Sequence, residues 1–152
     1  MSANELEEMG PIDYLLIEWP KQEPSGEVAP IVVDLVERGI VRVLDLAFIA
    51  REEDGSVTAL TISDLGEKVE ELNVFEGASS GLVSDEDVAE AGSALDPGTI
   101  GALLVYENRW AAPFATAVRR TGGQLVANGR IPVQAVLAAL DALEAEAASA
   151  NA

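Results

Sequence analysis

The sequence contains no cysteine and no histidine. Without cysteine the chain has no disulfide framework, no thiolate nucleophile and no cysteine metal site. Without histidine it lacks the commonest general base and the usual zinc ligand. Both absences argue against an enzyme, so we expect no catalytic residue, no cofactor and no metal.

Cationic side chains are also scarce: nine Lys and Arg face 27 Asp and Glu, for a formal net charge of −18. A field of this sign repels phosphate backbones and anionic lipid, so we expect neither nucleic acid nor a membrane as partner. No apolar run approaches the ~20 residues of a membrane span. Residues 1–9 contain three Glu and no apolar core, unlike a signal peptide, so we expect a cytoplasmic protein.

What the chain does have is an ordinary globular composition, with 49% hydrophobic residues in 152. A chain of this length forms one domain that buries roughly 70% of its unfolded surface. We predict a flexible tail over residues 1–10, a single domain over 11–147 that contains a helical insertion over 63–98, and a short tail over 148–152.

Periodicity predicts both helices and strands. Strands are expected over residues 11–19, 41–51, 56–62, 99–107 and 124–129, and helices over 27–38, 64–72, 84–95, 109–121 and 132–147. The Asp54-Gly55 turn predicts a hairpin between the second and third strands. The first strand is apolar on both faces, which is typical of a central strand covered on both sides. The helix over 27–38 has one predicted buried stripe: Val28, Ile31, Val32, Leu35 and Val36.

This order predicts an α+β fold, a ferredoxin-like split β-α-β sandwich with the acidic helical insertion before the fourth strand. Right-handed connections would place the helices at 27–38 and 109–121 on one sheet face. The opposite face is also apolar and must be covered. A second copy would make the protein a homodimer through that face; the alternatives are the insertion or the helix over 132–147 acting as a lid.

A few polar residues could form a site. Asp45 is a carboxylate among apolar strand neighbours and needs Arg42, another cation or backbone donors. The residues Glu107 to Trp110 lie at the corner between the fourth strand and its helix. There the helix N-terminus and Arg109 could hold an anion; the alternative is an N-cap with Trp110 packed in the core. Arg130 could pair with Glu107 or Asp45, or reach a ligand. The candidate ligand or ion-pair cluster is therefore Asp45, Glu107, Asn108, Arg109, Trp110 and Arg130.

Several phrases resemble known bacterial families. Gly81-Leu-Val-Ser-Asp-Glu-Asp87, Leu95-Asp-Pro-Gly-Thr-Ile-Gly-Ala-Leu-Leu-Val105 and Gly122-Gly-Gln-Leu-Val126 are similar to the DUF1269 group, which includes general stress protein 17M-like proteins. Gly10-Pro-Ile-Asp-Tyr14 and Glu107-Asn-Arg-Trp-Ala-Ala-Pro-Phe114 resemble the actinobacterial DUF6325 branch.

The resemblance implies no established activity and no catalytic residues. Relatives are often described as membrane proteins, but residues 63–98 are too acidic here to enter a bilayer. It also implies a small SHOCT-domain protein as a possible partner. Three hypotheses follow: a non-catalytic, self-associating stress-related or regulatory module, a small-ligand-binding sensor, and a dimeric stacked-sheet enzyme.

Overall fold

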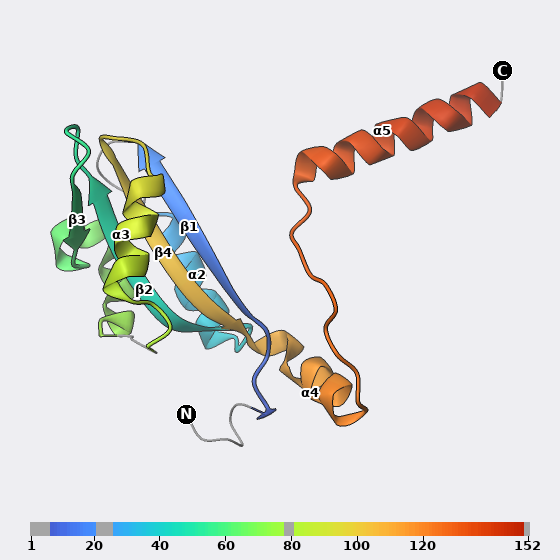
Figure 1. Ribbon diagram of the computed structural model, residues 1–152, viewed down its shortest axis with the longest axis horizontal. Coiled ribbons are helices and arrows are strands. Elements are labelled where there is room, and N and C mark those ends of the chain that lie inside the picture. The colour runs from blue at the N-terminus through green and yellow to red at the C-terminus, as the bar shows by residue number, and fades with distance from the viewer. Residues whose placement is uncertain (1–6, 21–25, 78–80, 151–152) are drawn as a thin grey trace. The chain divides into compact units, whose positions relative to one another are not determined.

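The computed structural model describes residues 7–20, 26–77 and 81–150 (Figure 1). The outer ends of both predicted tails, residues 1–6 and 151–152, lie outside the described residues. The chain divides into two compact units, Met1–Thr121 and Gly122–Ala152. Each unit is considered by itself below.

The first unit contains a four-stranded antiparallel sheet in the order β1-β4-β2-β3. Its strands are β1 (Ile12–Pro20), β2 (Val41–Arg51), β3 (Val57–Leu60) and β4 (Thr99–Asn108). The predicted hairpin between β2 and β3 is confirmed, with Gly55 at a φ of 89° that favours glycine. Together with the helices, this sheet confirms the α+β class.

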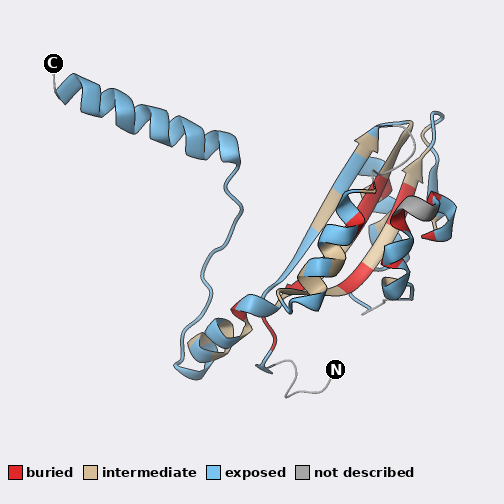
Figure 2. Cartoon of the chain, turned by 180° about the vertical axis from the view of Figure 1, so that it is seen from behind, coloured by how far each residue is buried: buried red, intermediate tan, exposed pale blue. Residues whose placement is uncertain are grey.

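Both faces of the sheet are covered, at least in part, by helices (Figures 1 and 2). On one face lie α2 (Val28–Glu37) and the 3-10 helices η1 (Ser63–Leu65) and η2 (Glu67–Phe75). Its core residues are Ala29, Phe48, Ile62, Leu65, Val69, Leu72 and Ala102. On the other face lies α3 (Asp85–Ala94), around the buried residues Ile49, Leu95 and Leu103. The insertion therefore contributes to both cores, through η2 on one face and α3 on the other.

The buried stripe of α2 differs from the predicted one. Val28 and Ile31 are exposed, whereas Ala29 is 1% exposed and Val33 packs against the core. Of the predicted residues, Val32 packs there, and Leu35 and Val36 are half-buried. The helix is turned toward Ala29 because η2 packs beside it, and a small residue allows two backbones to approach closely.

Two contacts position α3 on its face. Ser84 accepts a hydrogen bond from the Asp87 backbone N–H, and Asp87 accepts one from the Ser84 backbone N–H, which forms the predicted cap as a full capping box. At the other end Arg51 of β2 donates to the carbonyl oxygens of Ser93 and Leu95. A cation at this end offsets the negative end of the helix dipole.

The prediction of a central first strand is wrong: β1 lies at an edge of the sheet and pairs only with β4 among the described residues. Since β1 and β2 are both antiparallel to β4, they run parallel to each other on its two sides, with α2 between them in sequence. This is the first half of the predicted split β-α-β pattern.

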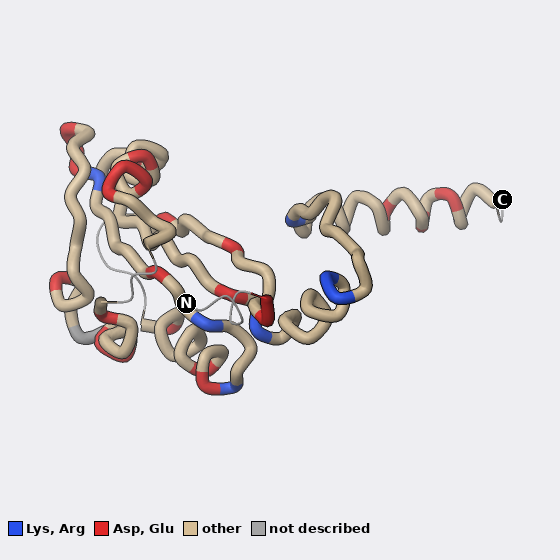
Figure 3. The backbone as a smooth tube through the Cα atoms, turned by 60° about the horizontal axis from the view of Figure 1, so that its bottom comes forward, with Lys and Arg blue, Asp and Glu red and all other residues tan. Residues whose placement is uncertain are grey.

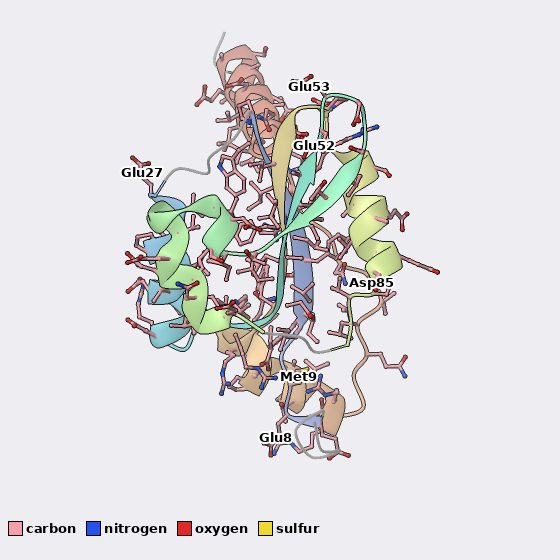
Figure 4. All side chains as sticks on the ribbon, turned by 90° about the vertical axis from the view of Figure 1, so that its left-hand side faces the viewer. Glu8, Met9, Glu27, Glu52, Glu53 and Asp85 are labelled. Atoms are coloured by element: carbon pink, nitrogen blue, oxygen red, sulfur yellow. The ribbon has the colours of Figure 1, made fainter. Side chains whose placement is uncertain are left out.

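The second half of that pattern differs. The helix predicted over 109–121 forms as η3 (Arg109–Ala111) and α4 (Ala112–Arg120), but α4 buries none of its side chains and does not share the sheet face of α2. Arg119 instead donates to the carbonyl oxygens of Glu7 and Met9, so α4 is fixed at the end of the sheet; Figure 4 shows Glu8 and Met9 beside it. Residues 9 and 10, assigned by sequence to a flexible tail, are buried.

In the second unit the only helix of the described residues is α5 (Val133–Ala150). The strand predicted over 124–129 is not formed, because these residues have no regular secondary structure and pair with no described strand. The side chains of α5 are exposed, including its apolar stripe of Val133, Val136, Leu137, Leu140 and Leu143. None of the described helices combines the length and the apolar character that crossing a membrane requires.

Candidate functional site

Glu107 lies at the end of β4 and is buried, with 4% of its surface exposed. Its Oε1 lies 2.9 Å from Nε of Arg42, its cross-strand partner on β2, in an ion pair that lacks an aligned hydrogen bond. Its Oε2 accepts a 2.8 Å hydrogen bond from the backbone N–H of Gly10. Both oxygens therefore bind groups of the protein itself, and the carboxylate joins the N-terminal segment to two strands.

Asn108 extends this junction. Its amide donates to the Pro11 carbonyl and to Asp13, and its Oδ1 accepts a 3.3 Å hydrogen bond from Trp110 Nε1. The predicted N-cap is wrong, because the Asn108 side chain does not cap η3. The predicted core packing of Trp110 is wrong too, because this residue is 67% exposed; its backbone N–H is held by the Ile40 carbonyl.

Five of the six candidate residues belong to the first unit. Glu107, Asn108, Arg109 and Trp110 are consecutive at the end of β4, with Arg109 exposed. Asp45 is buried on β2, next to a register shift between Val43 and Asp45. Arg130 belongs to the second unit. The cation that the sequence offered to Asp45, Arg42, forms its ion pair with Glu107.

A second feature of the surface was missed by the search for polar clusters. A groove of about 540 Å3 lies between β1 and α3, on the sheet face that α3 covers. Its apolar lining includes Ile12, Tyr14, Leu16, Leu82, Leu103 and Val105. We call this the β1 groove. Tyr14 is 74% exposed there, although β1 was expected to be covered on both faces.

The polar residues of the β1 groove are all acidic: Asp13, Asp87 and Glu90. The Ser84 backbone N–H and then the Ser84 hydroxyl donate to Asp87, which lowers the pKa of this carboxyl below its ordinary value. Asp87 is therefore ionised at neutral pH. The groove suits an apolar or cationic occupant and disfavours an anion.

Charge is unevenly distributed along the chain. Residues 1–107 carry 24 acids and five cations, whereas residues 108–140 carry four arginines and no acid at all. Figure 3 shows acidic positions over the sheet and its helices, and arginines on η3, on α4 and in the segment that follows. The net charge of the whole chain conceals this acid-free segment, which is visible in the sequence.

No metal site is formed by the described part of the chain, where no three Asp or Glu side chains converge. Figure 4 shows the carboxylates of Glu52 and Glu53 at the tip of the β2–β3 hairpin and that of Asp85 at the start of α3. The two hairpin acids and Asp85 belong to separate elements, and the Glu53 carboxylate lies over Gly98.

A family of known sequences covers almost the whole chain. It is described as "Family of unknown function (DUF6325)", and it matches residues 8–149. The chain belongs to the DUF6325 family. Neither a curated protein nor a solved structure matches it. Membership in DUF6325 confirms that part of the resemblance seen in the sequence, and it carries no activity with it.

Proposed function

We propose that this DUF6325 protein is a non-catalytic module that self-associates through the β1 groove. The observation that carries the proposal is an apolar groove beside a sheet edge with no second partner among the described residues. Water against Ile12, Tyr14 and Leu82 is unfavourable, and burying an aromatic or aliphatic side chain contributes roughly 1.5–3 kcal/mol.

The proposed interface is smaller than the whole sheet face that the sequence predicts. A dimer through the whole sheet face opposite α2 would have to displace α3, which packs there on Ile49 and Leu103. The insertion, through α3, thus covers β2 and β4 on this face. The part of that face that no element of the first unit covers is the strip along β1, and it is there that a second copy is proposed to bind.

A stress-related or regulatory role is part of the same proposal. It is supported by the phrases at 81–87, 95–105 and 122–126 that resemble the DUF1269 group and general stress protein 17M-like proteins. A small SHOCT-domain protein is proposed on the same ground as a further partner. A module that acts by binding needs no histidine or cysteine, which agrees with the composition.

Light scattering over a concentration series tests self-association. The chain has a mass of 15.9 kDa, and the expected result is a rise toward twice that value with concentration. Tyr14→Glu adds a fourth acid to the groove and should keep the protein monomeric. Val74→Glu is the matched control, since Val74 is similarly exposed on η2. A wild-type mass of one chain at every concentration would refute the proposal.

The second candidate is a small-ligand sensor, which the volume of the β1 groove favours because ligand pockets commonly enclose 300–1,000 Å3. The acidic rim restricts such a ligand to apolar or cationic molecules. A thermal-shift screen of these two classes separates the candidates. A ligand that raises the melting temperature of the wild type and not of Tyr14→Glu, in a protein that stays monomeric, would favour the sensor.

A further inference from the structure

β1 presents a long unprotected edge. It is nine residues long, pairs with β4 on one side, and has no described strand on the other. Natural edge strands are guarded by charged side chains, above all lysine, by internal proline, by bulges or by a covering element. β1 has two acids, Asp13 and Glu18, and no Lys or Arg; its one proline is its last residue, and its register with β4 is unbroken. Such an edge readily accepts another strand.

The chain also contains a segment suited to occupy such an edge. Residues 124–129 are predicted from the sequence as a short strand; in the structure they have no regular secondary structure and no ladder partner among the described residues. Leu125 is 72% exposed and Val126 95% exposed. A strand-forming segment with apolar side chains on both sides gains most from pairing with an open edge.

The distribution of charge favours the same segment, residues 124–129, as the added strand. It lies in the acid-free stretch 108–140, and Arg130 follows directly after it. β1 carries Asp13 and Glu18 and no cation, and the adjoining groove adds Asp87 and Glu90. In a chain of net charge −18, this is the stretch that approaches an acidic edge without like-charge repulsion.

The position of α4 favours a second copy over the same chain. To return a strand antiparallel beside its own β1, the connecting helix has to run back along the sheet. α4 does not do so: Arg119 binds it to the carbonyl oxygens of Glu7 and Met9 at the end of the sheet, where the Asn108 backbone N–H also binds the Pro11 carbonyl. Addition to another molecule leaves these contacts intact.

We propose that residues 124–129 of one molecule add as a strand to the open edge of β1 in a second copy, and that two copies exchange these strands symmetrically. The inference rests on the proposed self-association and specifies its occupant. Each sheet gains a fifth strand, and Leu125 or Val126 lies beside Tyr14 at the β1 groove of the partner molecule. Two such additions per dimer bury the edge of both molecules.

The absence of native cysteine makes cross-linking a clean test. Tyr14→Cys chains and size-tagged Val126→Cys or Leu125→Cys chains are mixed and treated with a short bismaleimide, which tolerates an uncertainty of one residue in register. The expected product is the heterodimer of mixed tags, at least several-fold above the yield with Val74→Cys in place of Tyr14→Cys. The double variant Tyr14→Cys/Val126→Cys should likewise cross-link between chains at a concentration where the wild type is dimeric.

Proline substitutions test the strand itself. Neighbouring residues of a strand direct their N–H groups to opposite sides, so either Leu125→Pro or Val126→Pro must remove a ladder hydrogen bond. One of the two should lower the dimer fraction at least tenfold more than Leu125→Ser and Val126→Ser, which keep the N–H. Both positions lie outside the first unit, which contains the sheet. The proline variants should therefore keep the circular dichroism spectrum of the wild type.

The outcomes separate the two proposals. A wild-type dimer with cross-linking no greater than the Val74→Cys control, or with both proline variants still dimeric, overturns strand exchange and leaves self-association standing. A double variant that cross-links only within its own chain, at a concentration where the wild type is dimeric, also overturns exchange, since the strand would then add to its own sheet. A monomeric wild type at all concentrations overturns both.

Discussion

Glu107 connects three segments that are distant in sequence. Its carboxylate pairs with Arg42 of β2 and accepts the Gly10 N–H, while the neighbouring Asn108 binds Pro11 and Asp13. A buried carboxylate is tolerated only when its oxygens have partners, and here both do. These contacts fix the start of β1 against the end of β4, and so define where the open edge begins.

Replacing Glu107 should therefore destabilise the first unit. Glu107→Ala removes the ion pair and the acceptor of Gly10, and we expect a loss of about 1–3 kcal/mol because a buried N–H is left unsatisfied. Glu107→Gln keeps an oxygen for Gly10 and should lose less. Urea denaturation followed by circular dichroism measures both. Equal losses for the two variants would contradict the role given to the hydrogen bond.

Gly10 is constrained by space. A Cβ at this position would collide with the Asn108 carbonyl oxygen and lie 3.2 Å from the Ala112 backbone nitrogen. Backbone atoms cannot rotate away as a side chain does, so Gly10→Ala should cost about 1–3 kcal/mol in unfolding free energy. Gly129→Ala is the control, with nothing within 4 Å of the added carbon, and should change stability by less than about 0.5 kcal/mol. Similar values for both variants would refute the close approach.

At the scale of elements, α3 is the component that converts a two-sided apolar sheet into a nearly closed core. Its N-terminus is fixed by the Ser84–Asp87 capping box and its C-terminus by Arg51. Ser84→Ala removes the cap and should cost about 0.5–2 kcal/mol. The measurement is the urea midpoint, with Ser93→Ala as the control because the Ser93 hydroxyl bonds only within its helix.

The same cap predicts a pH dependence. Hydrogen bonds from the Ser84 N–H and hydroxyl lower the pKa of Asp87 in the folded state. Asp87 therefore stabilises the fold above its unfolded pKa of about 3.9, and this stabilisation is lost as the pH falls through the lower folded value. The wild type should melt above Asp87→Asn at pH 7, and the difference should shrink below about pH 4. A difference that stays constant down to pH 2 would contradict the assignment.

The local sequence pattern was sufficient to predict most helices and strands, but not which of them lie next to one another in space. Periodicity predicted β1, α2, β2 and α3 within two residues at each end, because alternation and caps are local properties. The edge position of β1 depends on strand order, which alternation along one strand cannot specify. The segment 124–129 was predicted as a strand, but a strand also needs a partner. No described strand pairs with this segment.

The candidate site shows the same limit. Adjacent residues at the end of β4 were easy to group, yet their roles depend on Gly10, Pro11 and Arg42, which are 65–97 positions away in sequence. Trp110 was expected in the core because tryptophan is usually buried, but η3 directs it outward. The β1 groove was not predictable, because it is the space that α3 leaves beside β1.

At the scale of the whole molecule, the acid-free stretch 108–140 contrasts with a chain of net charge −18. A vesicle of anionic lipid would attract four arginines and repel the remainder of the chain, and repulsion should dominate. We expect no co-sedimentation with phosphatidylserine vesicles at 20 mM salt. Binding that disappears in Arg119→Gln/Arg120→Gln would show instead that the arginines dominate.

The salt dependence of the proposed dimer follows from comparing two opposing terms. Two molecules of charge −18 at about 30 Å repel by roughly 2 kcal/mol after screening at 0.1 M salt, and by almost nothing at 1 M. An exposed ion pair of Arg130 with an acid of β1 contributes at most about 1 kcal/mol, twice per dimer at best. Repulsion is lost completely with salt, while apolar burial and the strand ladder are not weakened, so the dimer should tighten as NaCl rises from 0.1 to 1 M.

Sedimentation equilibrium measures the dissociation constant across this range. Arg130→Glu should weaken the dimer more at 0.1 M than at 1 M, with Arg38→Glu, an exposed arginine at the C-cap of α2, as the control. Dissociation of the wild-type dimer at high salt would mean that charge attraction, and not the open edge of β1, holds the two copies together.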